Sequence, residues 1–250
     1  MVSRLELYAR IKEEFRFSWE EASGLIIAIL ITGFIFSFRD WGGDQFNLLI
    51  GIKNLLSVII IAAVAFFFHC SCQKVYGLST GHKVEFKLWW TGIMIALVLA
   101  FVTMGRLPLI LVGGVTVSFM VRQRLGEFRY GPSWRANGLT GVWGILGNLI
   151  LAVFFAIGFY LLPQSYFFEK GLILNLIMAG CSLIPLPKLD GLMILFSSRV
   201  IYCLTAFTVL LAWALLWVLL KLTGTKIGII IAIVIGGLAG TVALLVGSEK

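Results

Sequence analysis

Residues 48–68 read LLIGIKNLLSVIIIAAVAFFF and contain a single charged side chain, Lys53. An α-helix rises 1.5 Å per residue, so ~20 apolar residues cross the ~30 Å hydrocarbon core of a bilayer. The stretch is long enough to do so, and Lys53 lies close enough to its start for the ammonium group to reach the interface. Residues 48–68 are therefore predicted to span a membrane.

Comparable apolar runs recur along the chain, at 24–38, 88–104, 142–162, 172–195, 200–220 and 227–246. The composition agrees with this pattern. Hydrophobic residues make up 60% of the chain and charged residues 13%, and the mean hydropathy is +1.02. Soluble domains carry about 25% charged residues, so soluble globular and disordered classes are excluded. We predict an all-α polytopic membrane protein with six to seven transmembrane helices.

Two segments differ from these runs. Residues 1–22 mix charges with apolar side chains at helical spacing, which is typical of an amphipathic helix at a membrane surface. Residues 107–121 contain Pro108 and a Gly-Gly pair and are rich in Val, so we expect a small re-entrant or β element there. The predicted organisation is an amphipathic segment, 1–22, followed by a single transmembrane domain, 23–250.

The charge distribution concerns location and partners. The net charge of +8 comes from 20 Lys and Arg against 12 Asp and Glu, and these charges lie between the apolar runs. If 107–121 returns the chain across the membrane, most of the positive residues fall on the side of the N-terminus. Positive loops usually stay cytoplasmic. We therefore expect a multi-pass protein of the cell membrane with a cytoplasmic N-terminus, which contacts lipid and binds no nucleic acid.

Asp190 is a charged residue inside an apolar run. A charge at the centre of a membrane helix costs ~2.5–3.5 kcal/mol on insertion scales, so such residues are usually paired and functional. Pro185 and Pro187, just before it, remove backbone donors and break the helix. Two interpretations stay open. Either the broken helix presents Asp190 to a cation, a metal or a proton, or Asp190 caps the next helix or pairs with Lys188.

Two further motifs contain polar or small residues. His69 and Cys72 are three residues apart, so they share one face of a helix, and imidazole and thiolate both bind zinc. A lone histidine beside small apolar cysteines is the simpler interpretation of the same pattern. In the run 142–162, Gly144 and Asn148 are typical of close packing between membrane helices.

In this order, the motifs resemble the site-2 protease family, the intramembrane zinc metalloproteases. The stretch 183–191, LIPLPKLDG, is similar to the end of the family's N-x-x-P-x-P-x-L-D-G segment, and 144–148, GILGN, to its G-P-x-x-N turn. Residues 69–90 resemble an archaeal-type branch, in which the metal-binding helix continues into an extended segment. The resemblance covers about 47–200, which leaves the helices at 200–220 and 227–246 outside the core.

The resemblance implies a zinc site. The Asp of the family's L-D-G segment binds zinc, which makes Asp190 a metal ligand together with His69. Cys72 and Cys181 are further ligands to consider, because a His/Cys/Asp set can hold zinc.

The family's catalytic motif is degenerate in this chain. The motif is H-E-x-x-H, in which both His bind zinc and the Glu is the general base. Aligned on Gly77, His69 matches the second His, and Ala65 and Phe66 replace the first His and the Glu. Alanine has no lone pair and phenylalanine accepts no proton, so neither supplies the lost chemistry.

The resemblance also implies a groove for a substrate or partner helix. Its expected residues are Ser182, Pro185, Pro187, Asn148 and Gly144, with Ser182 standing where the family has an Asn.

Three functions follow from these patterns. The first is a pseudoprotease that binds transmembrane segments or membrane protein partners without cleaving them. The second is a divergent intramembrane zinc metalloprotease, for which Glu85 is the nearest acid that could act as a base. The third is an ion or proton transporter that uses Asp190.

Overall fold

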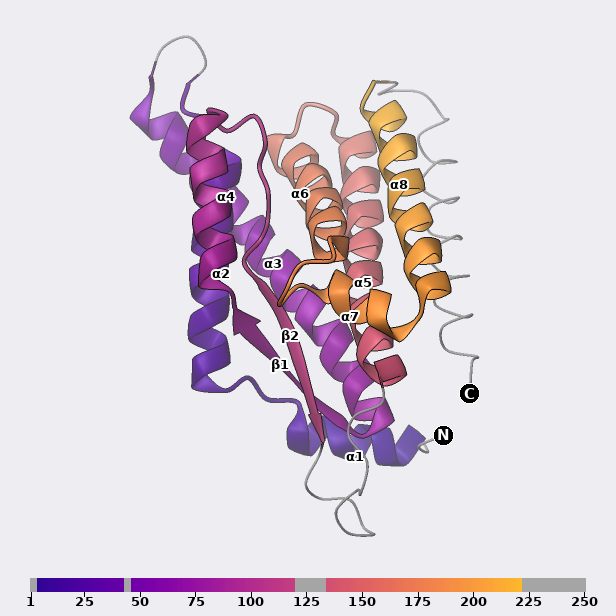
Figure 1. Cartoon of the computed structure of the whole chain (residues 1–250). Coiled ribbons are helices and arrows are strands. Elements are labelled where there is room, and N and C mark those ends of the chain that lie inside the picture. The colour runs from indigo at the N-terminus through magenta and orange to yellow at the C-terminus, as the bar shows by residue number, and fades with distance from the viewer. Residues whose placement is uncertain (1–3, 43–45, 120–133, 222–250) are drawn as a thin grey trace.

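The computed structural model describes residues 4–42, 46–119 and 134–221. The elements of these ranges are α1 (Arg4–Glu14), α2 (Trp19–Ser37), α3 (Leu48–Thr80), β1 (His82–Leu88), α4 (Trp90–Val102), β2 (Gly113–Phe119), α5 (Trp134–Leu161), α6 (Tyr166–Leu183), α7 (Asp190–Ser197) and α8 (Arg199–Lys221). The long helix α3 crosses the molecule diagonally, with α2 and α4 on one side and α5, α6 and α8 on the other (Figure 1). The fold is mostly helical, as predicted.

Four of the described helices are long and apolar enough to cross a membrane: α2, α3, α5 and α6. The helix α4 and the Arg199–Leu215 part of α8 are shorter apolar helices. These findings support a membrane protein, whereas the number of six to seven spans and the cytoplasmic N-terminus stay predictions. The expected helix at 227–246 lies outside the described residues.

The segment 107–121 contains a strand. β2 pairs antiparallel with β1, in a register that runs from His82 opposite Phe119 to Leu88 opposite Gly113. Gly113 has a φ of 153°, and a Cβ there would collide with the carbonyl oxygen of Lys87, so glycine is needed where the strand begins. The expected β element is confirmed. The chain between α4 and the end of β2 runs back toward the end of the molecule where α1 lies (Figure 1).

The helix α2 begins earlier than the sequence predicted. Its first residue is Trp19 rather than a residue near 24, and the Oγ of Ser18 caps it by accepting a hydrogen bond from the backbone N–H of Glu21. The segment 1–22 is therefore divided between α1 and the first turn of α2. The early start places Glu21 in the first turn of α2, where its side chain is buried and paired with Lys74.

A buried ion pair joins α2, α3 and β1. The Nζ of Lys74 lies 2.9 Å from Oε2 of Glu21 and donates a second hydrogen bond, also 2.9 Å long, to the carbonyl oxygen of Val84. The other oxygen of Glu21 accepts a hydrogen bond from the backbone N–H of Phe86. Buried ion pairs are tolerated where further hydrogen bonds satisfy both partners. This pair therefore closes the edge of β1 that β2 does not cover.

The run 172–195 is broken, as its prolines predicted. α6 ends at Leu183, α7 begins at Asp190, and Pro185 and Pro187 are exposed in the connection between them. Lys188 adopts a φ of 65°, and a Cβ on Gly191 would collide with the carbonyl oxygen of Leu183. The turn is therefore tight, and it brings the first residue of α7 against α3.

Candidate functional site

Asp190 and His69 meet in the centre of the molecule. The Nε2 of His69 lies 3.0 Å from Oδ2 of Asp190, although the residues are 121 positions apart in the chain. Both are buried, with exposed fractions of 5% for His69 and 2% for Asp190. Asp190 does not cap α7, because the N-cap residue is Leu189 and no side chain caps that helix end. The interpretation of Asp190 as a helix cap is therefore wrong, and its carboxylate instead joins α7 to α3.

Gln73 is a site residue that the sequence analysis missed. Its Nε2 donates a 2.9 Å hydrogen bond to the same Oδ2 of Asp190, and the side chain is fully buried. Gln73 follows His69 by four positions, so the two side chains lie on one face of α3, one turn apart. That spacing was the signal in the sequence that could have identified it.

The helix α5 contacts His69 from the other side. The Nδ2 of Asn148 donates to Nδ1 of His69 over 3.0 Å, so the proton of a neutral imidazole is on Nε2 and points to Asp190. At Gly144, one turn earlier, a Cβ would lie 2.5 Å from Nε2 of Gln73 and 2.7 Å from Nε2 of His69. The glycine allows α5 to approach closely enough for Asn148 to reach the histidine.

The sheet completes the surroundings of Asp190. The backbone N–H of Val115 in β2 points to Oδ1 of Asp190 over a longer distance, 3.5 Å. A Cβ on the neighbouring Gly114 would lie 2.5 Å from the carbonyl oxygen of Lys188. β2 therefore packs directly on the connection between α6 and α7, and the carboxylate of Asp190 receives donors from α3 and from β2.

These contacts favour a second alignment of the degenerate motif, one helical turn later than the alignment on Gly77. The two histidines of H-E-x-x-H are four residues apart, and the two side chains of α3 that contact Asp190 with this spacing are His69 and Gln73. In this alignment His69 matches the first His, and Gln73 replaces the second. Cys70 then replaces the Glu. Ala65 and Phe66 lie one turn earlier in the core, where Phe66 packs edge-on against Phe86 of β1. In this alignment the motif is also degenerate, with Cys70 and Gln73 in place of the Glu and the second His.

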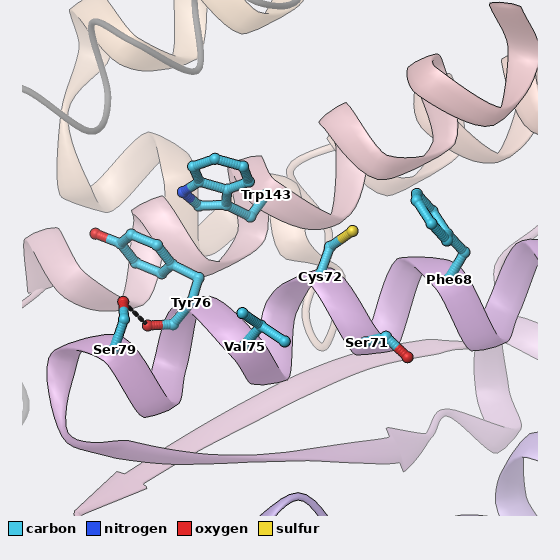
Figure 2. Close-up of a pocket in the computed structure, with 7 residues that line it drawn as sticks. All are labelled: Phe68, Ser71, Cys72, Val75, Tyr76, Ser79 and Trp143. Carbon is cyan, nitrogen blue, oxygen red and sulfur yellow. Dashed lines mark hydrogen bonds between the residues drawn. The ribbon is translucent and has the colours of Figure 1, made fainter. Parts of the chain in front are cut away.

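The two cysteines proposed as further ligands lie elsewhere. The Sγ of Cys181 accepts a hydrogen bond from the backbone N–H of Ile110, with 3.4 Å between nitrogen and sulfur. The side chain of Cys72 faces Gly147, where a Cβ would lie 3.0 Å from the sulfur, and it lines a cavity of about 400 Å³. Figure 2 shows this cavity, with Cys72 and Tyr76 on α3 and Trp143 on α5. The prediction that these cysteines complete the His69 and Asp190 pair is not supported by this geometry.

The donor set at Asp190 does not fit a zinc ion. Within the described residues, no three His, Cys, Asp or Glu side chains are grouped so that they could hold a metal. The two conventional ligands, His69 and Asp190, are hydrogen-bonded to each other. The third side chain is the amide of Gln73, which is not among the Cys, His, Asp and Glu ligands of protein zinc sites.

The residues of the predicted groove are divided between two environments. Asn148 and Gly144 are buried and belong to the cluster around His69. Pro185 and Pro187 are exposed in the connection after α6, and Ser182 is half-buried in the last turn of that helix. The structure therefore does not place all five residues in one surface.

Glu85, which the sequence offered as a possible general base, forms an ion pair with Lys83. Its Oε1 lies 2.8 Å from Nζ of Lys83 on the same strand, and the hydrogen bond from Lys83 lowers the pKa of Glu85. A carboxylate with a lowered pKa is a weaker proton acceptor. Glu85 is therefore poorly suited to act as a general base.

The comparisons with known proteins agree with the motif order. A protein of Methanocaldococcus jannaschii that carries the provisional name of a zinc metalloprotease is 29% identical over 181 residues, which cover 71% of this chain and 84% of the relative. The resemblance to the zinc metalloproteases is confirmed. Together with the four membrane-length helices, this match supports a site-2-protease-like membrane protein. No protein-family model and no solved structure matches the chain.

Proposed function

We propose that this protein is a pseudoprotease that binds transmembrane segments of other membrane proteins and does not cleave them. The observation that carries the proposal is the cluster at Asp190. Where a zinc protease needs a third metal ligand, Gln73 instead donates a hydrogen bond to the carboxylate. Two remaining ligands do not make the three protein ligands of a catalytic zinc site.

The lack of a suitable base supports the same conclusion. Cys70 stands where the motif has its Glu, and its side chain is buried, with an exposed fraction of 1%. An ordinary thiol still carries its own proton at pH 7, whereas a carboxylate is free to accept one. Proton transfer by a positioned base contributes about 10²–10⁴-fold to catalysis. A chain that lacks both the base and a metal ligand is expected to hydrolyse peptide bonds at a negligible rate.

Apolar cavities beside α3 supply a surface for binding. The cavity of about 400 Å³ is lined by Phe68, Val75 and Tyr76 of α3 and by Trp143 of α5 (Figure 2). A second cavity, of about 460 Å³, lies on the α2 side of the same helix. Both flank a helix long enough to cross the membrane. Apolar side chains of a neighbouring transmembrane helix would fill them.

The test uses the full chain in liposomes, with a synthetic single-span peptide of known sequence. Binding is measured by energy transfer between labels on the two molecules, and cleavage by mass spectrometry with and without added zinc. We expect saturable binding and an intact peptide. Val75→Trp, which fills the cavity between α3 and α5, should weaken binding several-fold. Val98→Trp, on the exposed face of α4, is the matched control and should not.

The second candidate is the divergent zinc metalloprotease, which the name of the archaeal relative favours. The same experiment decides between the two functions. A peptide product that requires zinc and disappears in Asp190→Asn would establish the metalloprotease and end the pseudoprotease proposal.

A further inference from the structure

The cluster at Asp190 carries an inference that does not depend on whether the protein binds or cleaves other helices. We infer that a hydrogen-bonded lock takes the place of a metal ion as the link between α3, α5, α7 and β2, and that Gln73 is the residue that keeps metal out. The lock consists of His69, Gln73, Asn148 and Asp190, with the backbone N–H of Val115.

Both carboxylate oxygens of Asp190 face hydrogen-bond donors. Oδ2 of Asp190 accepts hydrogen bonds from Nε2 of His69 and from Nε2 of Gln73, at 3.0 Å and 2.9 Å. Oδ1 faces the N–H of Val115. A metal ion would need the lone pairs that these donors occupy.

Both ring nitrogens of His69 also have hydrogen-bond partners. A metal-binding histidine usually donates its second ring N–H to an oxygen, which leaves a lone pair on the first nitrogen for the metal. Here Nδ1 of His69 accepts from Nδ2 of Asn148. The remaining proton is then on Nε2, and this nitrogen points to Asp190 as a donor rather than to a metal as a ligand.

The amide of Gln73 uses its NH₂ group and not its oxygen. Within the described part of the chain, its Oε1 is buried and has no hydrogen-bond partner. Leaving a buried acceptor unsatisfied is unfavourable. In this orientation the NH₂ group donates a 2.9 Å hydrogen bond to Oδ2 of Asp190. Gln73 therefore acts as a donor to the carboxylate.

The site is also one substitution from a metal-binding set. Gln73 lies one turn from His69 on the face of α3 that meets Asp190, so a histidine at position 73 would complete two imidazoles and one carboxylate. That is the number of protein ligands in catalytic zinc sites. We therefore expect that one substitution can create zinc binding and that another can lower the stability of the fold.

The test measures zinc by elemental analysis and the thermal midpoint of unfolding for the full chain purified in mild detergent. For the wild type we expect far less than one zinc ion per chain, and a midpoint that neither zinc nor a chelator moves. Gln73→His should take up about one zinc ion per chain. Its midpoint should fall when the zinc is chelated. Ser71→His is the control, because Ser71 lines the cavity between α3 and α5 and does not contact Asp190.

A loss-of-function variant keeps the test valid if Gln73→His does not fold. Gln73→Met has a similar length and no NH₂ group, so it should lower the thermal midpoint by several degrees without changing the zinc content. One zinc ion per wild-type chain, lost in His69→Ala, would overturn the lock. That result would not by itself overturn the pseudoprotease, because a chain that binds zinc need not cleave a peptide. Conversely, cleavage by a chain that holds no zinc would overturn the pseudoprotease and leave the lock intact.

Discussion

Two buried carboxylates, Glu21 and Asp190, are bound by neighbouring residues of α3 in different ways. Lys74 forms an ion pair with Glu21, in which Nζ lies 2.9 Å from Oε2. Gln73, the residue before Lys74, points in a different direction from the helix and offers Asp190 a neutral amide. In the first cluster, which we call the clamp, the ammonium group of Lys74 balances the charge of Glu21. The second cluster surrounds its carboxylate with hydrogen-bond donors from α3 and β2 and contains no cationic side chain that stays charged by itself.

The largest effect is expected from breaking the clamp. Lys74→Met leaves the carboxylate of Glu21 buried without a countercharge, so the free energy of unfolding should fall by about 3–5 kcal/mol. Denaturant unfolding in detergent measures this change. Lys83→Met is the matched control, because Lys83 pairs with Glu85 at the surface of the same region and such pairs contribute about 0.2–1 kcal/mol. Equal losses in the two variants would show that the clamp is not structural.

A smaller effect is expected from crowding the second cluster. In Gly144→Ala, the new methyl group would approach Nε2 of Gln73 to within 2.5 Å, so α5 must shift, at a cost of about 1–3 kcal/mol. Gly180→Ala is a control in α6, where the nearest atom to a new Cβ is Nε1 of Trp213 at 3.6 Å. That variant should be neutral or stabilised by up to about 1 kcal/mol through helix propensity. The comparison fails if both glycines tolerate alanine.

Removing the donor to Nδ1 of His69 should have a comparable or smaller effect. In Asn148→Leu, His69 loses its contact with α5, and the expected loss is ~1.5 kcal/mol, since the histidine keeps its bond to Asp190. Asn175→Leu is a control with the same change in α6, where the amide bonds only the carbonyl oxygen of Gly171, one turn earlier in the same helix. Asn148→Leu should change the ring signals of His69 in NMR spectra, whereas Asn175→Leu should leave them in place.

The smallest effect concerns pH at the surface pair. Lys83 lowers the pKa of Glu85 in the folded protein, so the pair stabilises the fold above the ordinary Glu pKa of about 4.3, and this contribution disappears as the pH falls through the folded pKa. The change is expected to be well under 1 kcal/mol, because the pair is exposed to solvent. Unfolding of the wild type and of Glu85→Gln, compared between pH 6 and the acid range, should differ in slope. Parallel curves would show that the pair contributes nothing.

The sequence predicted features that depend on local pattern. The apolar run 48–68 indicated a membrane helix, the prolines at 185 and 187 indicated the helix break, and the Gly-Gly pair near residue 113 indicated a non-helical segment. Each of these follows from propensities or lengths that act within a few residues. The proximity of His69 and Asp190 was expected from the resemblance to a family, because no local rule joins residues so far apart.

The sequence held one signal for the role of Gln73, its spacing of four residues from His69. An amide in a helix is ordinary by composition, and only the contact with Asp190 shows which turn of α3 faces the site. Alignment on Gly77 displaced the motif by one helical turn, since positions four apart lie on nearly the same face. The pairing of Glu21 with Lys74 was also missed, because the sequence indicated a surface helix where the fold buries the acid.

The most direct test compares the wild type with Cys70→Glu/Gln73→His, which restores H-E-x-x-H at the position that faces Asp190. Both chains are placed in liposomes with a single-span peptide and zinc, and the peptide is analysed by mass spectrometry. The account predicts an intact peptide with the wild type and zinc-dependent cleavage with the double variant. Zinc-dependent cleavage by the wild type, abolished in Asp190→Asn, would contradict it.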